Sequence, residues 1–274
     1  MSPTVSIVVP AHNGMPWIKD AIDSVVAQSF ADWEIVVRDD GSTDGTREWL
    51  ASLTDMRIRV EIADAAGAAA NWTEVSKLAQ GRLVKILCQD DLVLPGCLAE
   101  QVAAFDANPS AVMVASRHTV VDADGKTVIA RHGLSNLLGL IPGRTALTRS
   151  VATGANQFGE PVSVMFRRDA LQESLPFDPD FPYLTDLDMY RKVLSHGDFV
   201  GLPDVHAVFR ISRNSWSQVL ANVQSSEFVR WIRRGNAANE FDLNPVSTLV
   251  AIVLVNARAF ARRIVVGLAN RKTR

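Results

Sequence analysis

Short apolar runs alternate with amphipathic segments along the first 105 residues of the chain. Strands are predicted at residues 5–9, 33–37, 57–62 and 83–87. Most of these runs are almost continuously apolar, which is typical of parallel strands covered on both faces. Helices are predicted between the strands, because apolar residues recur there at helical spacing. The alternation predicts an α/β fold whose open, mostly parallel sheet is flanked by helices.

The pattern changes after residue 110. Further strands are predicted at residues 111–116, 162–166 and 205–211, a hairpin at 118–130 and a helix at 185–196. Asp124-Gly125 is the predicted hairpin turn, because this dipeptide favours tight turns between strands. Residues 131–160 are rich in Gly, Ser, Asn and Thr and predict a long, partly helical loop region, which in a compact domain is usually functional or mobile.

Three of the four early strands run directly into polar loops. The loops read PAHN at residues 10–13, RDDGS at 38–42 and CQDD at 88–91. In open sheets of this kind, ligands bind outside the carboxyl ends of the strands. A single acidic pair at such a position would be a helix N-cap or a solvated turn. Two pairs at one edge of a sheet favour a binding site, because buried carboxylates must face a cleft or a partner.

The two acidic pairs suit different parts of a nucleotide-linked substrate. Asp90 and Asp91 would hold a hard divalent cation while a substrate diphosphate supplies further oxygens. The cation would neutralise the charge that builds up on a phosphate leaving group. Asp39 and Asp40 would accept hydrogen bonds from a base N–H and from ribose hydroxyls.

Composition narrows the classes of protein that remain. Hydrophobic residues make up 47% of the chain and predict a substantial core, while the net charge of -2 gives no electrostatic basis for nucleic-acid binding. Cys88 and Cys97 match neither a disulfide framework nor a metal site and are interpreted as reduced thiols. No basic and apolar leader precedes the first strand, so a cytoplasmic location is expected. Glycine-rich dinucleotide and P-loop motifs, HExxH and GxSxG are absent from the sequence.

Four segments together resemble the family 2 glycosyltransferases of the GT-A fold. They are PAHN after the first strand, VVRDDGSTDGT, GAAAN before a helix, and QDD before LVLPG. The resemblance is close over residues 5–100 and looser over residues 155–217. It implies an inverting, metal-dependent enzyme that moves a sugar from a UDP- or dTDP-linked donor to a hydroxyl of a glycan or lipid-linked acceptor. It also implies a role in bacterial cell-surface polysaccharide synthesis.

The resemblance divides the chain into functional parts. Residues 1–213 would form the GT-A domain, with a nucleotide-binding half at 1–110 and an acceptor-binding half at 111–213, and residues 214–274 would form a C-terminal helical extension. Two departures from the family pattern are Gln89 in place of an acid and Thr185 in place of a glutamate. They keep open the alternative of a non-catalytic nucleotide-sugar-binding or scaffold protein with the same fold.

The loops after the first two strands supply the base-binding residues that the resemblance implies. Pro10, His12 and Asp40 would line the nucleobase pocket. Asn13 shares the first loop, and Asp39 would support the turn that holds Asp40. His12 stands where the family commonly has a tyrosine, and an imidazole can still stack on a base.

The resemblance implies further donor-side residues along the chain. Asn71 matches the family's asparagine in the third helix, although the preceding arginine of the family is Ala70 here. Asp90 would face the ribose, and Asp91 would ligate Mg²⁺ or Mn²⁺. Arg210 would steady the diphosphate leaving group.

Asp186 is the catalytic base that the resemblance implies. Residues 183–190 read YLTDLDMY and are similar to the family's EDxDLW segment, in which the second acid is the base. Inverting transfer needs a carboxylate that takes the proton of the acceptor hydroxyl as it attacks the anomeric carbon. From the residues alone, Asp186 would be a helix cap, and the resemblance favours the base.

Two acceptor-side residues follow from the looser part of the resemblance. Glu160 lies in a segment similar to the family's acceptor loop and would bind a sugar hydroxyl. Trp216 lies in a segment similar to the part that closes over the diphosphate. The alternatives that stay open are a surface salt bridge for Glu160 and a packed aromatic for Trp216.

The C-terminal segment combines apolar and basic residues. Residues 246–255 are mostly apolar but fall short of the ~20 residues that span a bilayer. Six basic residues follow, interleaved with apolar ones. Two interpretations stay open: a basic amphipathic helix at a membrane surface, or a helix packed on the domain or on a second subunit in a homodimer.

Overall fold

The computed structural model describes residues 2–211, 219–220 and 222–272, with side chains as far as residue 260. Trp216 therefore lies outside the described residues. The first half contains β1 (Val5–Ala11), α1 (Trp17–Val26), β2 (Trp33–Asp40), α2 (Thr46–Ala51), β3 (Ile58–Ala63), α3 (Ala68–Lys77), β4 (Leu83–Ile86), β5 (Leu92–Val93) and α4 (Cys97–Ala107). The predicted alternation of strand and helix is confirmed there.

The second half is less regular. It contains β6 (Ala111–Val121), β7 (Thr127–His132), β8 (Gly139–Ile141), α5 (Gly143–Ala152), the 3-10 turn η1 (Pro161–Ser163), β9 (Val164–Arg167), α6 (Arg168–Glu173), α7 (Thr185–Val193), β10 (Asp198–Arg210), α9 (Gln224–Ala237) and α10 (Pro245–Lys272). The hairpin is confirmed, since β6 and β7 pair antiparallel around the Asp124-Gly125 turn. The strands predicted at 111–116 and 205–211 are longer than predicted, because β6 and β10 pair in parallel over most of their length.

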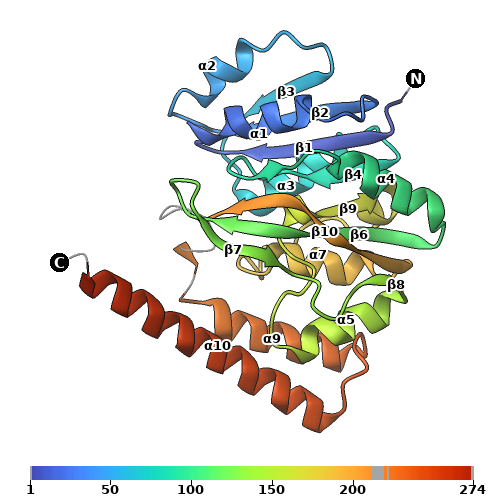
Figure 1. The fold of residues 1–274 in the computed structure, drawn as a ribbon, viewed down its shortest axis with the longest axis vertical. Coiled ribbons are helices and arrows are strands. Elements are labelled where there is room, and N and C mark those ends of the chain that lie inside the picture. Colours follow the sequence, from blue (N-terminus) through green and yellow to red (C-terminus); the bar gives the residue numbers. More distant parts are fainter. Residues whose placement is uncertain (1, 212–218, 221, 273–274) are drawn as a thin grey trace.

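The described strands form one open sheet (Figure 1). Their order is β3-β2-β1-β4-β9-β6-β10-β5, with β7 paired to β6 and β8 paired to β10. The longest pairings, β1 with β2, β2 with β3 and β6 with β10, are parallel. The short strand β9 joins the two parallel parts by pairing antiparallel with both β4 and β6. The predicted α/β class with a mostly parallel open sheet is therefore confirmed.

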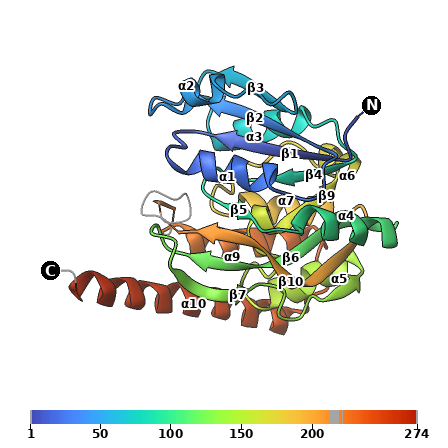
Figure 2. The same cartoon turned by 45° about the horizontal axis from the view of Figure 1, so that its top comes forward.

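Helices cover both faces of the sheet (Figure 2). The alternation of side chains along a strand lets the apolar run of β1 supply both layers, Ile7 on one face and Val8 on the other. Helices α1, α2 and α4 pack on the face of Ile7. Helices α3, α5, α6 and α7 pack on the face of Val8.

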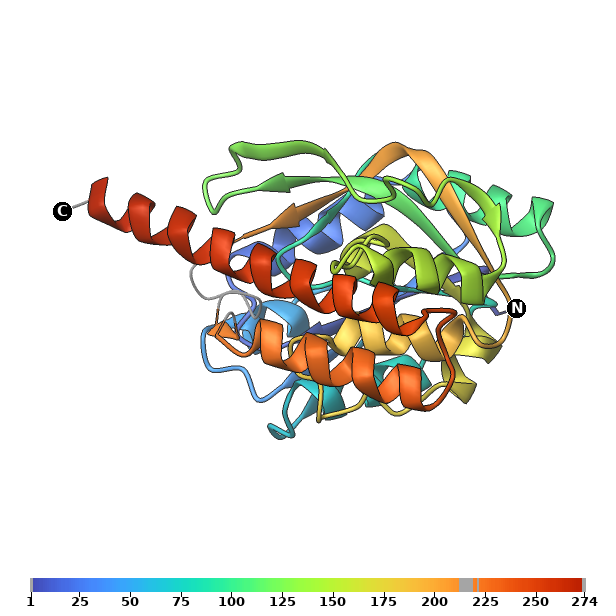
Figure 3. The same ribbon diagram turned by 90° about the horizontal axis from the view of Figure 1, so that it is seen from below.

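Helices α9 and α10 form an outer layer on that second face. They lie side by side below α5 and α7, and the C-terminal end of α10 extends past the rest of the chain (Figure 3). Trp231 of α9 and Ala251 of α10 are buried against the domain. Among the residues that the structure describes, none of the helices combines the length and the apolar character that crossing a membrane requires.

Candidate active site

The three polar loops meet at one edge of the sheet because β1, β2 and β4 run in parallel. The side chain of Gln89 accepts a hydrogen bond from the backbone N–H of His12 at 2.8 Å and donates one to the carbonyl of His12 at 2.8 Å. Nδ1 of His12 lies 2.7 Å from the carbonyl oxygen of Asp40. The backbone N–H of Asn13 donates to Oγ of Ser42 at 2.8 Å. Gln89, which replaces an acid of the family motif, thus ties the first loop to the third.

The first acidic pair is held by partners within the protein. Oδ2 of the fully buried Asp39 accepts hydrogen bonds from Nε of Arg47 at 2.6 Å and from the backbone N–H of Ser42 at 3.1 Å. The two carboxylate oxygens of Asp40 accept from the backbone N–H groups of Ala66 at 2.8 Å and Gly67 at 3.0 Å. These bonds fix the turn after β2 and the loop before α3. Each oxygen of Asp40 keeps a second lone pair for a ligand.

Asn71 and Pro10 are buried beneath these loops. The side chain of Asn71 donates to the carbonyls of Ala11 and Arg38, both at 3.3 Å, and accepts from Nη1 of Arg38 at 3.0 Å. Pro10 lies within the buried strand β1. Both residues therefore position the loop that carries His12 and Asn13, whose side chains are exposed.

The second acidic pair follows β4 and has few partners. Oδ1 of Asp91 accepts the backbone N–H of Arg210 at 3.0 Å, whereas the buried Oδ2 has no hydrogen-bond partner among the described residues. Burial and then the neighbouring charge of Asp90 raise the pKa of Asp91 well above its usual range. Burial also raises the pKa of Asp90. Each carboxylate is therefore costly to hold charged without a cation or a proton.

Arg210 braces this acidic loop from β10. Its Nε donates to the carbonyl of Asp90 at 3.2 Å, and its guanidinium lies 4.3 Å from the ring centroid of Trp17. Nη1 is 3.4 Å from the carbonyl of Ala123 in the β6–β7 turn. Only 7% of Arg210 is exposed. The guanidinium thus positions the loop of Asp90 and lies beside it.

The chemistry of this donor set fits a divalent cation. Asp91 offers a buried oxygen without a partner, and Asp90 adds a second carboxylate beside it. Mg²⁺ and Mn²⁺ prefer oxygen ligands, and Mg²⁺ usually takes one or two carboxylates and completes its sphere with substrate phosphates and water. Both polar atoms of the Gln89 side chain bond to His12, which positions Gln89 toward the first loop.

Asp186 is held at the start of α7. Its Oδ2 accepts a hydrogen bond from the side chain of Asn156 at 2.9 Å, and its Oδ1 accepts from the backbone N–H of Leu187 at 2.7 Å. Burial, with a further contribution from the negative charge of Glu160, raises the pKa of Asp186 to about 7. A carboxyl group with this pKa can take and release a proton near neutral pH.

Glu160 is paired with a buried histidine. Its Oε2 lies 2.7 Å from Nε2 of His118 on β6, and Nδ1 of His118 lies 3.1 Å from Oγ of Ser163. Burial acts to raise the pKa of Glu160, but the charge and the hydrogen bond of His118 outweigh it and lower the pKa below its usual value. His118 is fully buried, whereas 29% of the Glu160 side chain is exposed. The pair therefore presents an ionised carboxylate.

The predicted residues of the two halves converge around Cys88. Burial and then the charges of Asp91, Asp90, Asp186 and Glu160 raise the pKa of its thiol well above the usual range. Four carboxylates from three separate segments therefore lie close enough to act on one side chain. Tyr190 of α7 adds a hydroxyl that donates to the carbonyl of Gly159 at 3.2 Å.

Sequence reasoning missed three residues that contact the segments of Asp186 and Glu160. They are Asn156, Tyr190 and His118, which contact Asp186, Gly159 and Glu160. Their partners lie 30, 31 and 42 positions away in the chain. No local sequence pattern predicts contacts between residues so far apart. The nearest sequence signal is the glycine at 159, which adopts a left-handed backbone conformation with φ of 94° beside Glu160.

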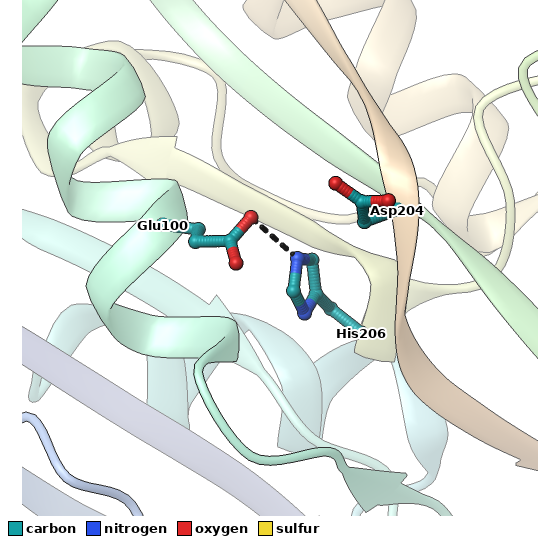
Figure 4. Close-up of side chains that lie close together, drawn as sticks. All are labelled: Glu100, Asp204 and His206. Carbon is teal, nitrogen blue, oxygen red and sulfur yellow. Dashed lines mark hydrogen bonds and ion pairs between the residues drawn. The ribbon is translucent and has the colours of Figure 1, made fainter.

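Another cluster of possible metal ligands lies between α4 and β10. Glu100 of α4 and Asp204 and His206 of β10 approach one another, with ligand atoms within 4.8 Å (Figure 4). Nε2 of His206 lies 2.7 Å from Oε2 of Glu100. Nδ1 of His206 is buried and has no hydrogen-bond partner among the described residues, whereas metal-bound histidines almost always donate from their second nitrogen. The arrangement therefore fits a hydrogen bond between β10 and α4 better than a metal centre.

Comparisons with known sequences agree over most of the chain. The profile described as Glycosyl transferase family 2 matches residues 6–175. WfgD of Escherichia coli, a UDP-Glc:alpha-D-GlcNAc-diphosphoundecaprenol beta-1,3-glucosyltransferase, is 26% identical over 248 residues, which are 89% of this chain and 89% of that protein. TuaG of Bacillus subtilis, a putative teichuronic acid biosynthesis glycosyltransferase, is 37% identical over 92 residues. That match covers 32% of this chain and 36% of TuaG.

A solved structure shares the fold. S. aureus TarS 1-349 in complex with UDP-GlcNAc matches 95% of this chain and 73% of its own chain, with a TM-score of 0.68 and 18% sequence identity. At this identity the likeness concerns the arrangement of helices and strands. It extends over both halves of the sheet, since nearly the whole chain is covered.

Proposed function

The chain belongs to glycosyl transferase family 2, and from this premise we propose an inverting, metal-dependent sugar transfer from a UDP- or dTDP-linked donor to a hydroxyl of a glycan or lipid-linked acceptor. Two relatives support this choice. The name of WfgD gives UDP-Glc as its donor and a diphosphoundecaprenol-linked sugar as its acceptor. The name of TuaG refers to the biosynthesis of teichuronic acid. The proposal includes the expected cytoplasmic location, at the inner face of the cell membrane.

The convergence of carboxylates around Cys88 carries the proposal. Asp90 and Asp91 come from the half expected to bind the nucleotide, and Glu160 and Asp186 come from the half expected to bind the acceptor. A transferase needs a leaving group and an attacking hydroxyl on opposite sides of one anomeric carbon. A protein that only binds a nucleotide sugar has no need of a base with a pKa of about 7 beside the donor site.

On the acceptor side, Asp186 would remove the proton from the attacking hydroxyl. Asn156 holds one of its carboxylate oxygens, and the backbone N–H of Leu187 holds the other. The position at the start of α7 favours the ionised form, whereas burial opposes it. Glu160, kept ionised by His118, would accept a hydrogen bond from a second hydroxyl of the acceptor sugar. Trp216, which lies outside the described residues, is proposed to contact the acceptor on this side.

On the donor side, the loops after β1 and β2 would hold the nucleotide. Asp40 and His12 would contact the base, and Asp90 would contact the ribose. Asp91 would ligate Mg²⁺ or Mn²⁺, which, when bound, neutralises charge on the diphosphate leaving group. Arg210 supports this side by holding the carbonyl of Asp90 and by adding positive charge close to it.

The decisive variant is Asp186→Asn. It removes the proton acceptor and keeps the shape, so we expect transfer to fall by about a thousandfold while nucleotide-sugar binding stays unchanged. Asp169→Asn is the matched control, because Asp169 also lies in the first turn of a helix, where its Oδ1 accepts the next backbone N–H at 2.8 Å. Transfer is measured as release of nucleoside diphosphate with a panel of nucleotide sugars and acceptors.

Three results would each contradict part of the proposal. Unchanged turnover in Asp186→Asn would remove the base assignment. Nucleotide-sugar binding by the wild type without transfer to any acceptor would favour the scaffold alternative that Gln89 and Thr185 keep open. Equal affinity for nucleotide sugar with and without Mg²⁺ or Mn²⁺, measured by calorimetry, would remove the metal from the mechanism.

A further inference from the structure

One side of α10 exposes a continuous apolar surface. The exposed fractions are 71% for Val246, 62% for Leu249, 49% for Val250, 57% for Val253 and 66% for Phe260. At 100° per residue these positions share one side of a helix. The opposite side packs on the domain through Ala251 and Val255, which are 0% and 4% exposed. We call the exposed set, Val246, Leu249, Val250, Val253 and Phe260, the outer stripe.

The charge of this part of the chain has one sign. No Asp or Glu occurs between Leu243 and the last residue, Arg274. The same stretch carries the basic residues Arg258, Arg262, Arg263, Arg271, Lys272 and Arg274. An apolar stripe on a helix that has only positive charges is complementary to an anionic lipid surface, where apolar side chains enter the interface and basic ones meet the headgroups.

A second copy of the chain is a poorer partner for the same surface. Two α10 helices that paired along their outer stripes would bring only positive charges together, because neither helix offers an acid. Like charges at such spacing destabilise helix pairs, whereas opposite charges at the flanking positions stabilise them. The single sign of charge therefore favours lipid over self-association.

Helix α10 also packs tightly on the loop that follows α5. This loop, residues 153–160, contains Asn156 and Glu160, and we call it the acceptor loop. Gly154, with φ of 66°, lies so close to α10 that an added Cβ would come within 2.8 Å of the backbone nitrogen of Val255. Nε of Arg258 donates to the carbonyl of Thr153 at 3.2 Å. Two positions after Gly154 comes Asn156, which holds Asp186. The helix and the acceptor loop are therefore one packed unit.

We propose that α10 docks on an anionic lipid surface through the outer stripe, and that this contact presents the acceptor loop to a substrate anchored in the same surface. The proposal deepens the proposed function and rests on it, since it assigns the acceptor to the lipid-linked class. The docked helix lies in the interface, with Ala251 and Val255 still packed on the domain.

Vesicle co-sedimentation of the full chain tests the proposal. The vesicles are phosphatidylcholine alone or a mixture of phosphatidylcholine and phosphatidylglycerol. We expect binding to the mixed vesicles, weakening with added salt, and little binding to the neutral ones. The double variant Leu249→Glu with Val253→Glu should bind the mixed vesicles about tenfold or more weakly. Met56→Glu is the control for adding a glutamate to an exposed apolar position, because its side chain is 94% exposed elsewhere on the surface.

The thermal shift caused by a nucleotide sugar separates the possible outcomes. Both variants should keep that shift, which shows that they are folded. Vesicle binding by the double variant as tight as that of the wild type overturns the docking proposal and leaves the proposed function intact. The docking proposal is also overturned if light scattering shows that the wild type is a dimer and the double variant a monomer, and neither protein binds vesicles. If no nucleotide sugar stabilises the wild type, the proposed function fails, whatever the vesicles do.

Discussion

The pairs Asp39-Asp40 and Asp90-Asp91 look alike in the sequence and differ in the structure. Asp39 and Asp40 are the last residues of β2, Asp90 and Asp91 lie in the loop after β4, and both strands pair in parallel with β1. Asp39 pairs with Arg47, and Asp40 accepts from two backbone N–H groups; within the described part of the chain, Oδ1 of Asp39 has no partner. Asp91 accepts the backbone N–H of Arg210 with one oxygen, and its other oxygen has no partner among the residues described. Burial raises the pKa of both Asp90 and Asp91.

The difference separates carboxylates that stabilise the fold from carboxylates that are free to bind a ligand. A buried carboxylate that accepts backbone N–H bonds stabilises the loop that supplies them. A buried carboxylate without such bonds destabilises the protein until a cation or a proton neutralises it. Removing the charge should therefore lower stability at the first pair and lower function at the second.

Of substitutions in the two acidic pairs, Asp91→Asn should have the larger effect on function. The amide keeps the bond to the backbone N–H of Arg210 through its oxygen but cannot ligate a cation well, so we expect transfer to fall about a hundredfold or more. The melting temperature without ligand should not fall. Because the raised pKa lets the native state bind more protons than the unfolded state, stability falls as pH rises from the unfolded value toward the native one. Asn does not titrate, so Asp91→Asn should not lose stability in this way as pH rises.

Turnover with and without metal and calorimetric melting of the free protein check this prediction. The melting temperature of the wild type should decline as pH rises above about 4, and that decline should be smaller in Asp91→Asn. A variant that melts clearly below the wild type at neutral pH would show that Asp91 is a structural partner like Asp40.

Asp40→Asn should show the reverse effect. One of the two backbone N–H groups, of Ala66 or Gly67, would face the amide NH₂ and lose its acceptor. The expected loss is about 1–3 kcal/mol of unfolding free energy, and for a domain of this size each kcal/mol lowers the melting temperature by about 2–4 °C. Transfer at saturating donor should fall less than in Asp91→Asn. Equal melting of variant and wild type would contradict the structural role.

The sequence was sufficient for the parts that local patterns determine. Apolar runs located β1, β2 and β4, and the polar residues after them located the edge at which the loops meet. Because parallel strands share an edge, the meeting of PAHN, RDDGS and CQDD required no further information. The α/β class followed from the same alternation of strand and helix.

Other parts depend on contacts between distant segments. The sequence of β9 is an ordinary apolar run, and its antiparallel place between β4 and β6 follows from packing of the second half. The two DD pairs could not be distinguished, because the N–H groups that satisfy Asp40 lie 26 and 27 residues further on. The pairing of Glu160 with His118 was hidden for the same reason.

The smallest predicted effect concerns the interaction between Glu160 and Asp186. Burial is the main cause of the raised pKa of Asp186, and the negative charge of Glu160 adds to it. A base must be deprotonated to act, so transfer by the wild type should rise with pH through about 7. Glu160→Gln removes the like charge, and the rise should move to lower pH by up to about one unit.

The shape of the pH profile makes this prediction independent of substrate affinity. Glu160→Gln also loses a proposed contact to the acceptor, which lowers kcat/KM at every pH without moving the midpoint. Glu173→Gln is the control, since Glu173 is an exposed carboxylate on α6. A midpoint that stays at the wild-type pH would show that water or a bound cation screens Glu160 from Asp186. A midpoint that moves to lower pH would place Glu160 with Asp90 and Asp91, among the carboxylates whose charge acts on the reaction and does not hold a loop.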